Sequence, residues 1–541
     1  MKRWHRLSVW IRENRWLLAT LVVAFCLRVA NIGWGVPISS HTHFYHPDES
    51  KAYVSTLVFP QQYLSSDDFL YGTAIQYSIG LLLLPVKLLM VGVWSMPAEY
   101  KLTAIMFFRF CNVLMGTASV YLVYLLAGRL LDKRCGLIAA MLVSVALFHT
   151  LSSCLTTLEV GMSFLLLCCV LTCTNCLKAR SLRSFFFAGL AAGMLLGTKV
   201  TGALFVGCVF LWLTFGSVRS AGASKAVTGR WRPLAIFLVT TGAVFAVTTP
   251  HVVLDFGNFW DVMMQQKSTW YDKAPTTPTG ILYQWFDATS LAAGLPVAIT
   301  CLPGALCFGK GRRRKMALAG LCVVVYYLFW RGYLPPRFVT AVVPILCLFS
   351  AALWGWFMAR DRQWVRRASF AFVAMAIVWS LAGSVMGVTQ RWLDARTVAS
   401  RYIDRNLPRG SRIGIATDHN DHWTHHRWRY PRIDFEVHRD AHFLQRPEYI
   451  IVTSRELKIM RKALKSDRLR PDNLWNPAFH SDWYLNDPPI PAIFAFYREL
   501  FAGQTYEEVA AFMPWPPMRI VGAAPDVHLY RRREGTITNS N

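Results

Sequence analysis

Long apolar runs alternate with short polar segments from about residue 16 to residue 388. About eleven of these runs approach the ~20 residues that a helix needs to cross a hydrocarbon core. We expect spans over residues 16–37, 103–127, 134–151, 157–177, 184–198, 200–216, 233–250, 287–308, 316–331, 337–358 and 368–388. From about Gln390 onward no run is long enough to span. The pattern therefore predicts a polytopic α-helical membrane domain over residues 1–389 and a soluble domain over residues 390–541.

The polar tail shows a mixed pattern of its own. The pattern predicts helices over residues 396–406 and 505–513. It predicts short strands over residues 412–416, 449–453 and 528–531. The tail also contains no Cys, so we do not expect it to be held together by disulfides. It is predicted to be a small α/β domain.

The distribution of charge orients the chain. The formal net charge of +26 would suit nucleic acid, but the soluble tail is nearly balanced, and the excess lies in short loops between alternate apolar runs. Such loops stay cytoplasmic when they are rich in Lys and Arg. We therefore expect no nucleic-acid partner, a cytoplasmic N-terminus and an extracytoplasmic C-terminal domain. The basic loops lie near residues 2–15, 129–134, 178–183, 219–232, 310–315 and 360–367.

The apolar stretch 73–96 does not fit this alternation. If it crossed the membrane, Arg129 and every later basic loop would move to the outer face. We interpret it as an interfacial or re-entrant segment within a long first outer loop, residues 38–102.

Charged side chains gather on the outer face in this topology. Ionised groups are expensive beside a bilayer and are functional candidates by default. The acids are Asp48, Glu49 and Glu159, and the cations near outer helix ends are Arg109, Lys199, Arg331 and Arg337. Further cavity candidates are His46, Tyr71 and His251. Acids and cations together predict a cavity that handles an anionic group and a proton.

This set of residues suits transfer of a sugar from a lipid phosphate. A carboxylate such as Asp48 or Glu159 can deprotonate the acceptor. Cations stabilise the leaving phosphate, and the planar fork of Arg grips phosphate oxygens in pairs. The sequence has no Gly-rich strand–turn–helix fingerprint for a nucleotide. The chemistry points to a lipid-linked donor.

Several segments carry a family resemblance in their order along the chain. They are residues 46–49, 71–73 with 76–77, 109–134, 149–159, 193–199, 335–338 and 394–410. Together they resemble the GT-C superfamily of polyprenyl-phosphate-sugar-dependent glycosyltransferases, near the protein O-mannosyltransferase and aminoarabinose transferase group.

The resemblance implies a GT-C-like fold in a cell inner membrane and an inverting transfer with Asp48 as general base. It also implies a polyprenyl-phosphate-linked sugar donor and a protein, lipid or glycan acceptor. One position departs from the pattern: the second outer-loop acid is usually Asp and is Glu159 here. This leaves the role of Glu159 less defined than that of Asp48.

Other readings of these residues stay open. Asp48 and Glu49 also suit a solvated turn, and Glu159 suits the start of a helix. The four cations suit contact with lipid headgroups, and Arg28, within the first span, suits either a carboxylate partner or the interface. At the level of the whole protein, the alternatives are a transporter or flippase of an anionic lipid, and a non-catalytic scaffold.

The cofactor is also open. The sequence requires none, but Glu49 suits either a neighbouring side chain or a divalent metal ion. The His-rich loop 418–426 has spacing for metal ligands and equally suits an anionic membrane surface. The sugar, the acceptor and the carrier lipid are not defined by these residues.

Overall fold

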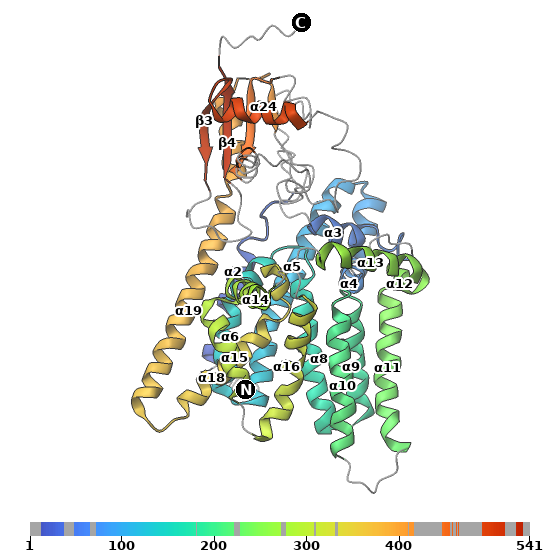
Figure 1. Ribbon diagram of the computed structural model, residues 1–541. Helices are drawn as coiled ribbons and strands as arrows, with labels where there is room; N and C mark the ends of the chain where they lie inside the picture. Colours follow the sequence, from blue (N-terminus) through green and yellow to red (C-terminus); the bar gives the residue numbers. More distant parts are fainter. Residues whose placement is uncertain are drawn as a thin grey trace. The chain divides into compact units, whose positions relative to one another are not determined.

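The computed structural model describes residues 12–36, 48–64, 72–179, 181–220, 228–271, 277–307, 310–330, 334–408, 410–415, 446–454, 457, 461, 464, 490–513 and 526–533. The chain forms two compact units (Figure 1). The first contains Met1–Ile32 and Asp48–Val385, and the second contains Gly33–Pro47 and Met386–Asn541.

The first unit is helical in its described part. Its helices are α2 (Arg15–Val29), α3 (Asp48–Leu57), α4 (Ala74–Lys87), the π-helix η1 (Leu88–Val93), α5 (Pro97–Leu130), α6 (Lys133–Ser144), α7 (Leu147–Ser152), α8 (Glu159–Ala179), α9 (Leu182–Leu196), α10 (Gly202–Ser220), α11 (Thr228–Thr248), α12 (Pro250–Leu254), α13 (Phe256–Tyr271), α14 (Pro278–Ala293), α15 (Leu295–Leu306), α16 (Lys310–Phe329), α17 (Pro336–Val339), α18 (Val343–Met358) and α19 (Gln363–Trp392). The last of these continues into the second unit.

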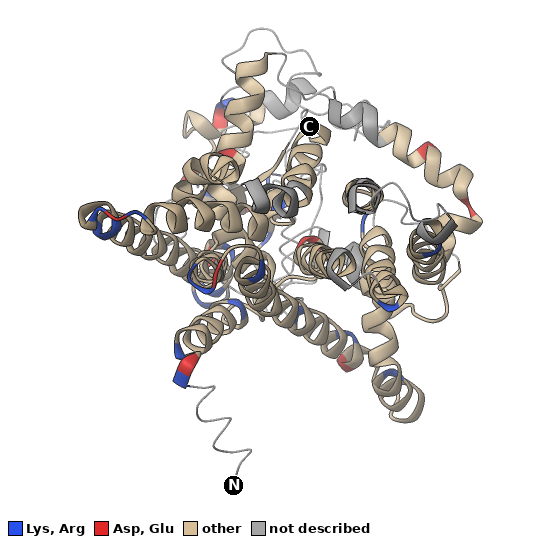
Figure 2. Cartoon of the chain, turned by 90° about the horizontal axis from the view of Figure 1, so that it is seen from below, with Lys and Arg blue, Asp and Glu red and all other residues tan. Residues whose placement is uncertain are grey.

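Length and apolarity support a membrane protein that crosses the bilayer several times. Within the described residues, 5 helices are long and apolar enough to span, or 6 if the bent pair α14–α15 counts as one span. Several other predicted spans are shorter apolar helices. Lys and Arg lie at several helix ends in the view from below (Figure 2). The number of eleven spans and the orientation of the termini stay predictions.

Glycines let two of these helices approach closely. α9 packs along α11, and in Figure 1 the two run beside α8 and α10. A Cβ atom on Gly189 would lie 2.8 Å from the carbonyl oxygen of Phe237, and one on Gly193 would lie 2.8 Å from that of Thr241. Larger residues would force these backbones apart, so small side chains set the spacing.

Some predicted spans are broken, contrary to the sequence analysis. The predicted span 287–308 is wrong as a single helix, because α14 and α15 meet at an angle of 115°. Gly294 between them has φ +97°, which a residue with a side chain rarely adopts. The predicted span 134–151 is likewise interrupted between α6 and α7, and the predicted span 337–358 consists of α17 and α18.

The stretch 73–96, expected to be interfacial or re-entrant, is mostly helical. α4 runs directly into η1, and Ala74–Val93 is among the helices long and apolar enough to cross a membrane. Its length therefore permits a span, and its interfacial position stays a prediction. Its first turn is tied to α9, because the Ala74 amide donates to the carbonyl of Gly197 (2.9 Å).

The second unit contains a sheet of four strands in the order β1-β2-β4-β3. They are β1 (Ile413–Ile415), β2 (Tyr449–Thr453), β3 (Tyr506–Phe512) and β4 (Val527–Arg532), accompanied by α20 (Ala395–Asn406) and α24 (Ile490–Phe501). β1 and β2 are parallel, whereas β4 is antiparallel to both β2 and β3. Buried side chains from α20 and the strands form one core, and side chains from α24 form another.

Most of the expected elements in this unit are confirmed, with one exception. The helix at 396–406 and the strands near 413, 449 and 528 occur as predicted. The helix predicted at 505–513 is wrong, because these residues form β3 along the edge of β4. The ion pair between Glu507 and Arg531 (2.6 Å) joins the two strands. Cross-strand pairing thus overrides a weak local helix preference.

Candidate active site

A fully buried ion pair joins α3 to α5. Arg109 in α5 donates from Nε to Glu49 Oε1 (3.0 Å) and from Nη2 to Glu49 Oε2 (2.8 Å). Both side chains have no exposed surface. Nη1 donates to the carbonyl of Ile32 (2.7 Å), three residues after the end of α2. The guanidinium therefore fixes the start of α3, which begins at Asp48.

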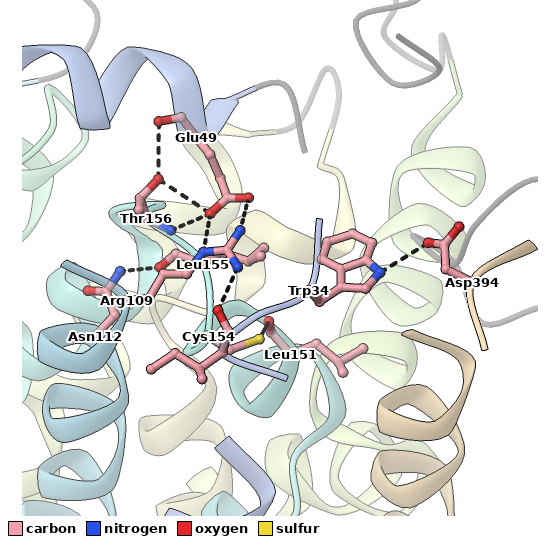
Figure 3. Close-up of polar contacts among 10 residues, drawn as sticks. Trp34, Glu49, Arg109, Asn112, Leu151, Cys154, Leu155, Thr156 and Asp394 are labelled. Carbon is pink, nitrogen blue, oxygen red and sulfur yellow. Dashed lines mark hydrogen bonds and ion pairs between the residues drawn. The ribbon is translucent and has the colours of Figure 1, made fainter. Parts of the chain in front are cut away.

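The loop between α7 and α8 completes this cluster (Figure 3). The Thr156 amide donates to Glu49 Oε1 (2.8 Å), and its hydroxyl donates to the backbone carbonyl of Glu49 (3.1 Å). Asn112, one turn after Arg109 on α5, donates to the carbonyls of Leu155 (2.5 Å) and Thr157 (2.9 Å). The acid, the guanidinium and the loop therefore form one rigid hydrogen-bonded group.

A second ion pair lies at the start of α8, where the same loop ends. Glu159, the first residue of α8, accepts from Lys199 Nζ at 3.0 Å, and both side chains are largely buried. Lys199 Nζ also lies 4.4 Å from the ring centroid of Phe338, and the guanidinium carbon of the half-buried Arg337 lies 5.0 Å from it. Two cations therefore share one aromatic ring beside Glu159.

Backbone contacts hold the turn that carries Lys199. The Thr249 hydroxyl donates to the carbonyl of Gly197 (3.2 Å), the same oxygen that the Ala74 amide approaches. A Cβ atom on Gly72 would lie 2.1 Å from that oxygen, so only glycine fits there. Three segments distant in sequence thus fix the position of Lys199.

A buried Arg contacts the residues that precede this loop in the chain. Arg28 in α2 donates to the carbonyls of Val143 and Ser144 (3.0 Å each) at the end of α6, and Nη2 lies 2.9 Å from His149 Nδ1. Arg28 always donates, so Nδ1 accepts and the imidazole is neutral. The expectation that Arg28 pairs with a carboxylate or reaches the interface is therefore wrong.

The structure brings together four of the predicted site residues as two ion pairs, Glu49–Arg109 and Glu159–Lys199, with Arg337 beside the second. His251 is buried in α12. Asp48 begins α3, but its side chain lies outside the described residues, as do His46, Tyr71, Arg331 and the His-rich loop 418–426. The roles of all these residues stay predictions.

Sequence reasoning missed the polar residues that hold the acids. Thr156 lies three residues before Glu159, and Asn112 lies three residues after Arg109, on the same face of α5. That helical spacing was the available signal for Asn112. Phe338 was noted only as part of a motif, although its ring lies under both cations.

The described residues contain no group of three or more His, Cys, Asp and Glu side chains placed to hold a metal ion. Glu49 instead holds a neighbouring side chain, one of the two roles expected for it. The divalent metal ion stays a prediction.

Comparisons with known proteins agree with this architecture. The model of one family, described as dolichyl-phosphate-mannose-protein mannosyltransferase, matches residues 91–253 of the 541 in the chain. This segment contains Arg109, Glu159 and Lys199. A search of curated proteins gives no match.

Solved structures share the fold at low sequence identity. The apo oligosaccharyltransferase of Archaeoglobus fulgidus aligns with a TM-score of 0.53 and 12% identity, over 92% of this chain and 79% of that chain. ArnT from Cupriavidus metallidurans, bound to undecaprenyl phosphate, aligns with a TM-score of 0.51 and 13% identity, over 84% and 95% respectively. AglB from A. fulgidus, in complex with an inhibitory peptide and a dolichol-phosphate, gives 0.50 and 11%, over 93% and 80%.

These likenesses confirm the resemblance to GT-C glycosyltransferases. The matched family model and the fold together support one class of enzyme, a glycosyltransferase of the GT-C type. They favour this class over the transporter and scaffold alternatives.

Proposed function

We propose that this glycosyltransferase moves a sugar from a polyprenyl-phosphate-linked donor to an acceptor on the extracytoplasmic face, with inversion and with Asp48 as general base. The acceptor is a protein, a lipid or a glycan. The observation that carries the proposal is the two buried ion pairs beside the α7–α8 loop, Glu49–Arg109 at Thr156 and Glu159–Lys199 where the loop ends.

The first ion pair supports a positioning role for Glu49 and Arg109. Both oxygens of Glu49 and two nitrogens of Arg109 are used within the pair, and neither side chain is exposed. Each nitrogen of the guanidinium already donates to an oxygen of the protein, which leaves few N–H groups for a donor phosphate. We therefore revise the predicted role of Arg109. Its proposed task is to fix the first turn of α3, which carries Asp48.

The second ion pair supports a role in charge stabilisation. Lys199 and Arg337 place two cations beside one aromatic ring, where a leaving phosphate would gain negative charge. Glu159 holds the Lys199 ammonium in place at 3.0 Å. We therefore assign Lys199 and Arg337 to the donor phosphate and Glu159 to the orientation of Lys199. Arg331 stays a further candidate for the phosphate.

The proposed step uses only these groups. The Asp48 carboxylate takes the proton from the acceptor hydroxyl or amine as that atom bonds to the anomeric carbon. The bond from this carbon to the phosphate oxygen breaks with its electron pair, and the polyprenyl phosphate leaves as an anion. Attack on the face opposite the phosphate inverts the anomeric configuration.

Purified protein in lipid nanodiscs tests the proposal with a panel of synthetic polyprenyl-phosphate sugars. The variant is Asp48→Asn, and the matched control is Glu99→Gln, an exposed acid in the first turn of α5. We expect the wild type and the control to release polyprenyl phosphate with one donor. Asp48→Asn should lose about 10²–10⁴-fold in rate while it remains folded, as expected for loss of a general base.

Two results would contradict the proposal. Full activity of Asp48→Asn, with loss of activity in Glu159→Gln, would move the general base to Glu159. Movement of labelled carrier lipid between leaflets, with no donor consumed by the wild type, would establish a flippase instead.

A further inference from the structure

Gln76, in the first turns of α4, carries a buried amide that the fold does not use. The residue has no exposed surface, and neither its side-chain oxygen nor its side-chain nitrogen has a hydrogen-bond partner among the described residues. Its backbone carbonyl, within α4, accepts from the hydroxyl of Thr56 (3.3 Å). A side-chain amide offers two donor hydrogens and two acceptor lone pairs. Burial without partners destabilises the folded protein, so such a group calls for a functional explanation.

Two contacts define the face of α4 on which Gln76 lies. Gly80 follows one turn later on the same face, and a Cβ atom there would lie 2.9 Å from Cβ of Phe59. Thr56, in α3, contacts the backbone of Gln76 itself. This face is therefore covered by α3 and the turn that follows it. Helical side chains lean toward the N-terminus of their helix, so the amide points toward the end of α4 that begins at Ala74.

The elements of the active site converge on that end of α4. Ala74 is bonded to Gly197, two residues before Lys199. Ile75 packs on α8, where a Cβ atom on Gly161 would lie 2.1 Å from its Cδ1, two residues after Glu159. The amide of Gln76 is thus directed toward the end of α4 that contacts the elements carrying Lys199 and Glu159.

We propose that Gln76 determines specificity by forming hydrogen bonds to ring hydroxyls of the transferred sugar. This inference rests on the proposed function. A sugar hydroxyl both donates and accepts, so vicinal hydroxyls can satisfy the oxygen and the nitrogen of one amide. A phosphate oxygen only accepts, so it would leave the amide oxygen unpaired. The ligand that matches this side chain is the sugar ring and not the phosphate.

Replacement by Leu separates this role from a structural one. Gln76→Leu removes the amide with little change in volume and breaks no side-chain hydrogen bond of the described structure. The melting temperature should therefore stay equal to that of the wild type or rise. The value of kcat/KM for the preferred donor should fall about 10–100-fold, because the variant loses the hydrogen bonds between the amide and the sugar hydroxyls.

Donors that each lack one ring hydroxyl show which hydroxyl forms a hydrogen bond with the amide of Gln76. The wild type should discriminate strongly against loss of one or two particular hydroxyls, and Gln76→Leu should lose that discrimination while it keeps the others. The matched control is Ser380→Ala, which removes another buried oxygen without a partner, in α19. It should retain wild-type kinetics and wild-type donor preference.

Several outcomes would overturn the inference. If Gln76→Leu and the unbranched Gln76→Met both fail to fold, the amide is structural. If both variants fold and discriminate among the deoxy donors as the wild type does, Gln76 forms no hydrogen bond that determines the choice of sugar. A change confined to KM for the acceptor would assign the amide to the acceptor instead. Failure of the wild type to use any donor would refute the proposed function itself, which is a separate result.

Discussion

Loss of charge at Glu49 tests the assignment of the Glu49–Arg109 pair most directly. In Glu49→Gln the side chain keeps one oxygen, and its new amide group faces a donor of Arg109 in either orientation, and the Thr156 amide as well if it replaces Oε1. The Arg109 guanidinium then stays buried without its counter-charge. Removal of one partner from a buried ion pair costs about 3–5 kcal/mol. One charge-assisted hydrogen bond is lost if the amide replaces Oε2, and two are lost if it replaces Oε1; at about 1.5–3 kcal/mol each, the loss is of similar size.

The free energy of unfolding is followed through the melting temperature of the purified protein in detergent. Its 21 Trp residues give an intrinsic fluorescence signal for thermal unfolding. We expect Glu49→Gln to lower the melting temperature by roughly 3–4 °C, because about 2 cal/mol/K per residue gives an unfolding entropy of about 1.1 kcal/mol/K for the 541 residues. Glu99→Gln on exposed α5 surface is the control and should melt close to the wild type.

A double variant distinguishes a charge pair from a packing effect. Glu49→Leu with Arg109→Met removes both charges, and it should be less destabilised than Arg109→Met alone, because no uncompensated buried charge remains. The reasoning would be refuted if Glu49→Gln melted within about 1 °C of Glu99→Gln, a difference expected of surface substitutions.

Three further predictions follow from the contacts of the site. Lys199→Met leaves Glu159 buried without its cation, so it should lower both the melting temperature and the rate of transfer, and Lys199→Arg should retain more of each in the same nanodisc assay. Gly72→Ala should reduce activity more than Gly207→Ala, because its Cβ would lie 2.1 Å from a backbone oxygen whereas Gly207 has open space; equal activities would contradict this. Trp34→Leu breaks a 3.0 Å hydrogen bond to Asp394 and should speed proteolysis near the start of α20, as seen by limited trypsin digestion followed by mass spectrometry.

The class of the protein could be predicted from local pattern alone. Transfer of a segment into a bilayer depends on its own side chains, so runs of apolar residues indicate membrane helices without knowledge of their neighbours. The same holds for β2, a short apolar strand between polar turns. The acids and cations of the site were also found from sequence, because ionised groups beside a bilayer are rare.

The pairing of those groups was decided only by the tertiary structure. Glu49 and Arg109 are 60 residues apart, so no periodicity relates them, and the sequence assigned Arg109 to the phosphate instead. β3 was wrongly predicted to be a helix because it is held in the sheet by pairing with β4, which lies outside the local sequence.

The sequence by itself thus predicted several long apolar helices and named the residue types that form the two ion pairs. Only the fold decided which acid holds which cation, where Gly294 breaks a span, and that the amide of Gln76 stays without a partner. The physical reason is that hydropathy is a property of each segment, whereas an ion pair or an unused amide depends on what distant segments bring beside it.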